Sequence, residues 1–306
     1  MSKVLVCGSR RGVLMCTFPA ALLCAAGAMA ADFNDRGNIV IADQFNNRVI
    51  EIDPHTHAIL WQFGNGSDKA GPHSIVGTND AERFGPLTLI SGTGIPPASP
   101  PLPGCSDPVN GCPDNRVIIV SPAGRIVWQY GMTLVPGAGA NQLNNPNSAE
   151  LLQNGHVLIA DENNNRVIEV TTGKQLVRQF TAGGTVSGAA FASRLRNGNT
   201  LITDANNNRI VEVNAADTVV WEYRTDTESG TNSAPLPTRA VRLANGNTLI
   251  SDQFNNRVIE ITPAKDIVFQ QGVLNTPGDG FNRLNGPYDA KVVGDFTGLT
   301  PPFDDD

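Results

Sequence analysis

One ten-residue stretch of this chain occurs twice, letter for letter. DQFNNRVIEI stands at 43–52 and again at 252–261, with near-copies DENNNRVIEV at 161–170 and DANNNRIVEV at 204–213, and a fainter copy, PDNRVIIV, at 113–120. The arginines of neighbouring copies are 43 to 68 residues apart. Such spacings are typical of solenoids, propellers and other repeat arrays. The chain is therefore expected to be built from copies of one structural module.

Each copy predicts short strands separated by turns. In 246–270, the β-branched and apolar runs Thr248–Ser251, Arg257–Ile261 and Ile267–Gln270 alternate with segments rich in Asn and Asp, and Thr238–Leu243 lies upstream as a fourth run. Asn and Asp favour turns because their side chains bond the nearby backbone and tolerate left-handed φ. Four short strands per repeat predict a propeller blade, and the lack of a sustained helical period favours an all-β fold.

The predicted strands give five blades, with six as the alternative if the longest interval hides a degenerate blade. We attribute that interval to an insert at about 93–114. The chain then ends in an unpaired first strand, Tyr288–Val293, which is expected to pair with the N-terminal strands and close the ring. First strands are expected to begin near Pro72, Pro146, Ala189, Pro237 and Pro287, and second strands near Asn38, Leu87, His156, Asn199 and Asn247.

The first thirty residues have the features of a secretory signal peptide. Lys3, Arg10 and Arg11 precede an apolar run, and Ala28-Met29-Ala30 offers a small-residue cleavage site. The segment around Arg10 and Arg11, SRRGVL, resembles a twin-arginine motif, so the Sec and twin-arginine routes both stay open. We expect a signal peptide at 1–30, one propeller domain at 31–306, and an exported protein, periplasmic or extracellular, with no membrane span in its mature chain.

The net charge limits the classes of partner that are expected, and the cysteine content indicates the compartment. The formal net charge of −7 becomes about −10 without the three basic residues of the leader, which argues against nucleic acid or an anionic membrane as a partner. Only Cys105 and Cys112 remain in the mature chain, inside a segment rich in Pro and Gly. In an exported protein this pair predicts one local disulfide.

The repeats also resemble a known family. NGNTLISDQFNNRVIEI and its variants NGHVLIADENNNRVIEV and NGNTLITDANNNRIVEV are similar to NHL-repeat β-propellers, and GRIVWQY (124–130) and TVVWEY (218–223) resemble the related quinoprotein-like and arylsulfotransferase-like propellers. The resemblance extends over essentially the whole mature chain. It implies the architecture but not the function, because NHL-like propellers include a peptide-amidating lyase, lactone hydrolases and pure binding modules.

Acidic and basic residues recur at fixed places in the repeats. An Asp–Arg pair across each hairpin is expected to hold the turn rather than to catalyse, because near-identical copies leave no copy with a separate role. Asp161-x-Asn163-x-Asn165 begins like a calcium loop but lacks the later Gly and Glu, so Ca²⁺ stays possible and no cofactor is predicted firmly. The expected pairs are Asp43 with Arg48, Asp161 with Arg166, Asp204 with Arg209, and Asp252 with Arg257.

A binding site is expected where the repeats diverge. The loops between second and third strands, the blade-to-blade connections and the insert emerge on one face, which rings the mouth of the axial channel. His73 and Asp289 are candidate acid and base, Arg239 a candidate carboxylate or sulfate ligand, and Glu150 a candidate partner of Asp289 for a divalent ion. The predicted ligand-binding residues are His73, Asn147, Glu150, Arg239, Tyr288 and Asp289.

Two functions from different classes follow. The favoured hypothesis is a non-catalytic scaffold that binds a protein, a glycan or a small molecule through this face and the channel mouth. The alternative is a propeller-type enzyme, such as a lactonase, lyase or transferase, that uses the axial polar residues with a divalent metal. A three-histidine zinc site is not expected, because only His73 of the four histidines lies near the predicted mouth.

Overall fold

The computed structural model describes residues 32–292 and residue 295, all within the compact unit 31–306. The predicted signal peptide lies outside the described residues. Nineteen strands and four short 3-10 helices make up the regular structure of this part, and it contains no α-helix. The all-β prediction is therefore confirmed. Within the same residues, none of the helices has the length and apolar character needed to span a membrane.

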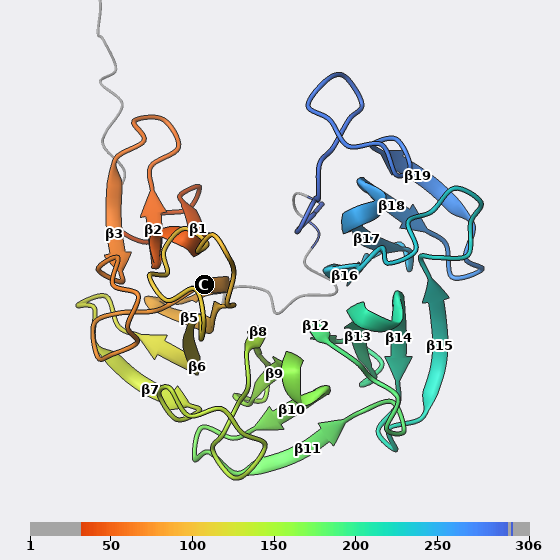
Figure 1. The fold of residues 1–306 in the computed structure, drawn as a ribbon. Helices are drawn as coiled ribbons and strands as arrows, with labels where there is room; N and C mark the ends of the chain where they lie inside the picture. Colours follow the sequence, from red (N-terminus) through yellow and green to blue (C-terminus); the bar gives the residue numbers. More distant parts are fainter. Residues whose placement is uncertain (1–31, 293–294, 296–306) are drawn as a thin grey trace, which may run out of the picture. The chain divides into compact units, whose positions relative to one another are not determined.

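The strands form five antiparallel sheets, which follow one another along the chain as the blades of a β-propeller (Figure 1). Blade one comprises β1 (Ile39–Asp43), β2 (Arg48–Ile52) and β3 (Ile59–Phe63). Blade two comprises β4 (Thr78–Phe84), β5 (Leu87–Ile95), β6 (Cys112–Val120) and β7 (Ile126–Tyr130). Blade three comprises β8 (Pro146–Leu151), β9 (Val157–Asp161), β10 (Arg166–Val170) and β11 (Leu176–Phe180). The last two blades comprise β12 (Ala189–Arg194), β13 (Thr200–Asp204), β14 (Arg209–Val213) and β15 (Val219–Arg224), then β16 (Arg239–Arg242), β17 (Thr248–Asp252), β18 (Arg257–Ile261) and β19 (Ile267–Gln271).

The first strands hold the blades together. β4, β8, β12 and β16 contact one another in succession and line the axis of the propeller. Each carries an alanine at the same register position, and these alanines pack in or against the hydrophobic clusters between neighbouring sheets. They are Ala81, Ala149, Ala192 and Ala240.

The predicted closure of the ring is not formed by the described residues. Blade one has three strands, β1 pairs only with β2, and residues 287–292 form no strand. The C-terminal segment instead bonds to the axial side of other blades: Thr238 Oγ1 donates to the Tyr288 carbonyl at 2.6 Å, and Tyr288 Oη donates to Asn147 Oδ1 at 2.9 Å. These bonds hold the segment against β16 and β8 rather than against β1.

The identical decapeptides form one type of hairpin turn. A 3-10 turn follows each aspartate, for example Gln44–Asn46 (η1) after Asp43, and the next asparagine, Asn47, has a left-handed φ of 51°. The same geometry recurs as η2 (Glu162–Asn164), η3 (Ala205–Asn207) and η4 (Gln253–Asn255). Asparagine fits the left-handed position because its side chain can bond locally there. All four expected Asp–Arg pairs are formed, with Oδ2 to Nε distances of 2.6–2.8 Å.

Blade two lacks the aspartate of the motif and replaces it from the opposite strand. Gly92 stands at the aspartate's register position, paired with Arg116. Asp114 supplies the carboxylate instead, bonding Nε of Arg116 and accepting the Val76 N–H at 2.8 Å. A Cβ on Gly92 would lie 2.7 Å from Asp114 Cγ, so the carboxylate fills the space that the side chain of residue 92 would occupy. The glycine and the displaced aspartate form one compensated pair.

The insert is shorter than predicted, because β5 and β6 continue beyond the usual hairpin. Ile95 pairs with Cys112, so the irregular loop runs from 96 to 111 rather than over 93–114. Cys105 and Cys112 form a disulfide, as predicted. The loop packs on blade one, where Asn47 Nδ2 donates to the Gly104 carbonyl at 2.6 Å.

Candidate functional site

One asparagine in every blade fixes where the next first strand begins. Its Oδ1 accepts a hydrogen bond from the backbone N–H of the residue just before β4, β8 or β12, from Leu236 shortly before β16, or from Gly286 before the C-terminal segment. The five bonds are Gly77 to Asn47 (2.9 Å), Asn145 to Asn115 (3.0 Å), Gly188 to Asn165 (2.8 Å), Leu236 to Asn208 (3.3 Å) and Gly286 to Asn256 (3.0 Å). The last bond places the segment from Pro287 to Lys291 where a further first strand would lie, although it is not a strand.

Strand register sorts the axial side chains into three tiers, which together we call the axial cluster. Equivalent positions follow from the pairing of each first strand with its second strand and, for the last segment, from the Gly286–Asn256 bond. The outer tier comprises Asn79, Asn147, Ala190, Thr238 and Tyr288. The middle tier comprises Asp80, Ser148, Phe191, Arg239 and Asp289, and the inner tier comprises Glu82, Glu150, Ser193, Val241 and Lys291.

Hydrogen bonds between amide and phenol groups connect residues of the outer tier. Asn147 Oδ1 accepts from Tyr288 Oη at 2.9 Å and from Asn79 Nδ2 at 3.3 Å. The Asn147 amide nitrogen donates to Glu162 Oε2 at 2.9 Å. Residues from blades two and three and from the C-terminal segment therefore meet in one hydrogen-bond network.

Arg239 is the centre of the middle tier. Its Nη2 lies 2.9 Å from Asp80 Oδ1, its Nε lies 3.1 Å from Asp289 Oδ1, and its guanidinium carbon stands 4.1 Å above the Phe191 ring. Lys291 Nζ bonds the other oxygen of Asp289 at 2.7 Å. Both basic groups of the cluster are thus paired with aspartates, and Arg239 also gains a cation–π contact.

The inner tier places two carboxyl groups close enough to interact. Burial, reinforced by the Asp80 charge, raises the pKa of Glu82 to about 8. Burial raises the pKa of Glu150 well above its usual value, and the neighbouring Glu82 carboxyl raises it further. Burial and the neighbouring carboxyl groups thus both favour the protonated forms of Glu82 and Glu150.

Three polar atoms of β8 and β12 find no hydrogen-bond partner among the described residues. They are Glu150 Oε1, Ser148 Oγ and Ser193 Oγ, in residues that are each at most 4% exposed. Ser148 and Glu150 lie on the same face of β8, because side chains two residues apart along a strand point the same way. Buried polar atoms without a partner in the protein are usually satisfied by water or by a ligand.

The structure brings together five of the six predicted ligand-binding residues. Asn147, Arg239, Tyr288 and Asp289 are joined by the bonds above, and Glu150 interacts electrostatically with Arg239. The sixth, His73, is exposed in a turn before β4 and makes none of these contacts. The prediction that the first strand of blade two begins near Pro72 is wrong, because the long connection continues to Gly77 and the strand begins at Thr78.

Sequence reasoning missed the blade-two members of the cluster. A strand beginning at Pro72 would have placed other residues on the axis. In the structure β4 begins at Thr78, and Asn79, Asp80 and Glu82 lie there instead. A signal for them exists in the chain, since NDAE at 79–82 matches NSAE at 147–150 in three of four letters. Aligning those two segments would have identified the glutamate pair.

A metal site would need several ligands that converge on one point. In the part of the chain that the structure describes, no three His, Cys, Asp or Glu side chains are arranged to hold a metal ion. Asp289 is bonded by Arg239 and Lys291, and its pairing with Glu150 around a divalent ion stays a prediction. Calcium binding at Asp161, Asn163 and Asn165 stays a prediction, with Asp161 bonded to Arg166 and Asn164.

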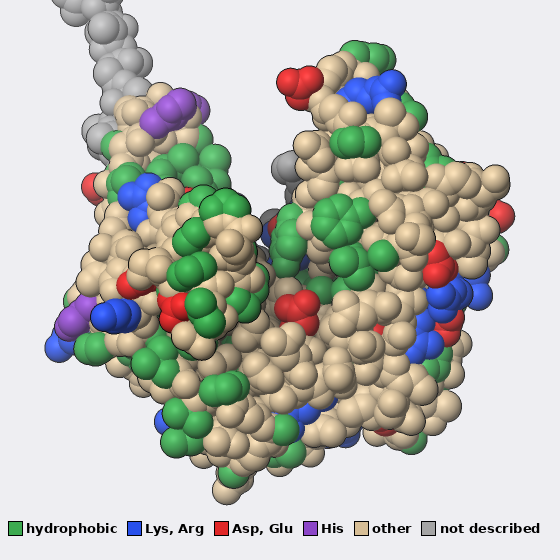
Figure 2. Space-filling model, in the orientation of Figure 1, with side chains coloured by type: hydrophobic (Ala, Val, Ile, Leu, Met, Phe, Trp, Pro, Cys, Tyr) green, Lys and Arg blue, Asp and Glu red, His purple; other side chains and the backbone are tan. Residues whose placement is uncertain are grey.

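The loop-rich face surrounds the outer tier. The 3-10 turn of a blade and the connection that enters it share backbone bonds, such as Asn163 N to Asn144 O (3.1 Å) and Phe254 N to Pro235 O (2.8 Å). Figure 2 shows hydrophobic side chains in green over the blade-two insert and over the last sheet on this face. Exposed apolar residues on its turns and connections are Phe45, Val109, Met132, Leu134, Phe254 and Phe281.

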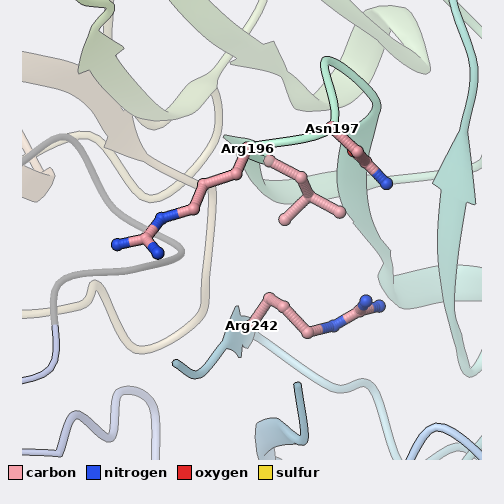
Figure 3. A pocket seen from close by; sticks show the side chains of 4 residues that line it. Arg196, Asn197 and Arg242 are labelled. Atoms are coloured by element: carbon pink, nitrogen blue, oxygen red, sulfur yellow. The ribbon is translucent and has the colours of Figure 1, made fainter. Parts of the chain in front are cut away.

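A pocket on the opposite face is lined by two arginines. It lies beside the turn between β12 and β13 and is lined by Leu195, Arg196, Asn197 and Arg242. Figure 3 shows the Arg196 and Arg242 side chains extending in opposite directions. Arg242 is also paired with Glu212 at 3.0 Å. The two guanidinium groups therefore do not converge on one anion.

Comparison with known proteins agrees with this architecture. A family model described as outer membrane protein assembly factor BamB matches residues 113–278, which is more than half of the chain. No curated protein matches the chain significantly. The match supports the quinoprotein-like part of the resemblance, whereas the assignment to NHL repeats stays a prediction.

Solved structures share the fold at low sequence identity. Virginiamycin B lyase from Staphylococcus aureus superposes with a TM-score of 0.53 at 14% identity, covering 81% of this chain and 69% of the lyase. A protein of unknown function from Bacteroides caccae gives 0.52 at 15% identity, covering 76% of this chain and 72% of that one. At these identities the likeness shows the fold alone.

Proposed function

The chain belongs to the outer membrane protein assembly factor BamB family, and we propose that it is a scaffold that binds a protein partner through its loop-rich face. The observation that carries the proposal is the apolar character of that face. Phe281 is fully exposed, Val109 is 77% exposed, and Phe45 and Phe254 are each about 40% exposed, all on turns or connections. Exposed apolar groups gathered on one face mark interaction sites.

The rigid scaffold behind these loops supports the same proposal. Phe45 and Phe254 stand on identical 3-10 turns, whose neighbours form the Asp–Arg pairs of blades one and five, and the pair of blade five is buried. Loops held by such a frame lose little conformational entropy on binding. The family is described as an assembly factor, which also fits a protein that binds other proteins.

Two variants and one control test the proposal. Phe281→Ser and Phe254→Ser change the loop-rich face, whereas Phe269→Ser removes a phenylalanine about as exposed as Phe254 (48% against 42%) from the outer strand β19. We expect co-purification of the partner from native cells to fall about tenfold or more with the first two variants, in keeping with the loss of an aromatic hot spot. Equal recovery with all three would overturn the proposal.

We also propose that the protein works outside the cytoplasm. The leader at 1–30 and the Cys105–Cys112 disulfide support export, because disulfides persist in oxidising compartments. Fractionation of native cells should recover the chain without its leader in the periplasm or medium. A full-length cytoplasmic product would contradict this.

The alternative, a propeller-type enzyme, is favoured by one observation. A carboxyl whose pKa burial raises to about 8, as for Glu82, stays protonated at neutral pH and has the property of a general acid. Under this hypothesis a panel of lactones and esters would include a substrate whose turnover is lost in Glu82→Gln. An unchanged rate in that variant would remove the axial carboxyls from the chemistry.

A further inference from the structure

The axial cluster contains carboxyl groups that no basic group neutralises. Arg239 pairs with Asp80 and Asp289, and Lys291 pairs with Asp289. Among the described residues, Glu82 and Glu150 form no ion pair, although both interact electrostatically with Arg239 and Lys291. If all groups were ionised, the cluster would carry four negative and two positive charges. In that fully ionised state the charge of the cluster is complementary to an added cation and not to an added anion.

The buried oxygen atoms without hydrogen-bond partners indicate which kind of cation would bind. Glu82 Oε2 accepts the Leu151 N–H at 3.1 Å, whereas Glu150 Oε1, Ser148 Oγ and Ser193 Oγ have no partner among the described residues. All three free groups are oxygens and can accept hydrogen bonds. An ammonium group carries one positive charge and several N–H donors, which suits oxygen acceptors around an ionisable carboxyl.

We propose that the axial cluster binds a small primary ammonium group, with Glu150, Ser148 and Ser193 accepting its hydrogen bonds. Binding ionises the carboxyl of Glu150, so one proton is released for each cation taken up, and the charge of the cluster is unchanged. The groups that face Glu150 are Glu82 and Asp80 on β4, Arg239 on β16, and Lys291 on the C-terminal segment. Because protons compete with the cation, affinity rises with pH until the carboxyl is ionised.

The competing explanation is an ordered water in place of the cation. A buried water also satisfies about three polar groups. The two differ in charge: a water neither releases a proton nor responds to added amine. The site is independent of the loop-rich face, because its residues lie on β8 and β12 and not on the turns.

The test is the melting temperature of the mature protein in ammonium chloride and methylammonium chloride, compared with tetramethylammonium and potassium chlorides at equal ionic strength. We expect the first two salts to raise it by about 3 °C or more and the last two to leave it unchanged. The rise should be larger at about pH 8 than at about pH 6, since protonated Glu82 and Glu150 oppose cation binding. No rise, or an equal rise with all four salts, would overturn the proposal.

Two variants of the site and two control variants separate ammonium binding from general stability. Glu150→Gln keeps the shape of the protonated side chain and should fold, but should lose the response to ammonium. Ser148→Ala should weaken the response, whereas Ser251→Ala should not, because Ser251 has an equally buried hydroxyl without a partner but lies on β17. Equal effects of the two serine variants would overturn the assignment. Phe281→Ser should keep the response, so that failure of this proposal and failure of protein binding can be told apart.

Discussion

Arg239 Nη2 lies 2.9 Å from Asp80 Oδ1, although the two residues are 159 positions apart in the chain. The ion pair joins the first strand of blade two to that of blade five across the axis. Both side chains are at most 13% exposed. Removing one member of such a pair leaves a buried charge without its partner, which costs about 3–5 kcal/mol.

We therefore expect Arg239→Met to destabilise the protein by about 3 kcal/mol in urea unfolding. Asp80→Asn in the same background should restore part of the loss, because it removes the unpaired carboxylate. The control is Arg224→Met, whose pair with Asp226 is much more exposed at 42% and 20%; it should cost less than about 1 kcal/mol. Equal losses for the two arginine variants would contradict the account.

The pKa of Glu82 makes the stability of the protein depend on pH in a defined window. Burial raises the folded-state pKa to about 8 from 4.5. Between these values the folded state holds a proton that the unfolded state has lost, so stability falls as pH rises, by up to about 1.4 kcal/mol per pH unit. Glu82→Gln lacks this dependence.

Unfolding of Glu82→Gln and of the wild type should therefore differ little at about pH 4.5 and most at about pH 8. The variant should be the more stable protein at the higher pH. Parallel pH profiles for Glu82→Gln and the wild type would show that Glu82 ionises normally.

The compensated pair in blade two predicts a rescue. Gly92→Asp restores the repeat sequence but places a Cβ 2.7 Å from Asp114 Cγ and adds a second buried carboxylate. Overpacking of this kind costs about 1–3 kcal/mol, before the added charge is counted. Asp114→Gly in the same chain should recover most of the loss, since the carboxylate introduced at position 92 can then bond Arg116. Urea unfolding of the single and double variants measures the recovery, and a double variant no more stable than Gly92→Asp alone would contradict the pairing.

Much of the fold was predictable, because the motif that repeats is also the part that forms strands and turns. The five blades, the hairpin turns and the disulfide follow from local residue types. The register of blade two does not, because a long connection and the exposed His73 precede β4 without a distinctive sequence boundary. The repeat pattern predicts Tyr288 at the channel mouth, but its hydrogen bond to Asn147 depends on tertiary packing that no local pattern encodes.

The asparagine at the left-handed position of each turn has two separable roles. Asn47 is fully buried with φ of 51°, and its amide bonds both Gly77 N and the Gly104 carbonyl. Asn47→Gly keeps the backbone conformation and loses both hydrogen bonds, at about 1–3 kcal/mol. Asn47→Ala should cost about 1 kcal/mol more, because alanine is strained at this φ. Equal stabilities of the two variants in urea unfolding would show that the backbone conformation contributes nothing.

The most direct test of the proposed scaffold function is site-specific photo-crosslinking in native cells. A photoreactive amino acid at position 281, on the loop-rich face, is compared with the same amino acid at position 269, on the outer strand β19. We predict a discrete protein adduct from position 281 and none from position 269. No adduct at 281, or the same adducts from both positions, would contradict the proposal that this face binds a protein partner.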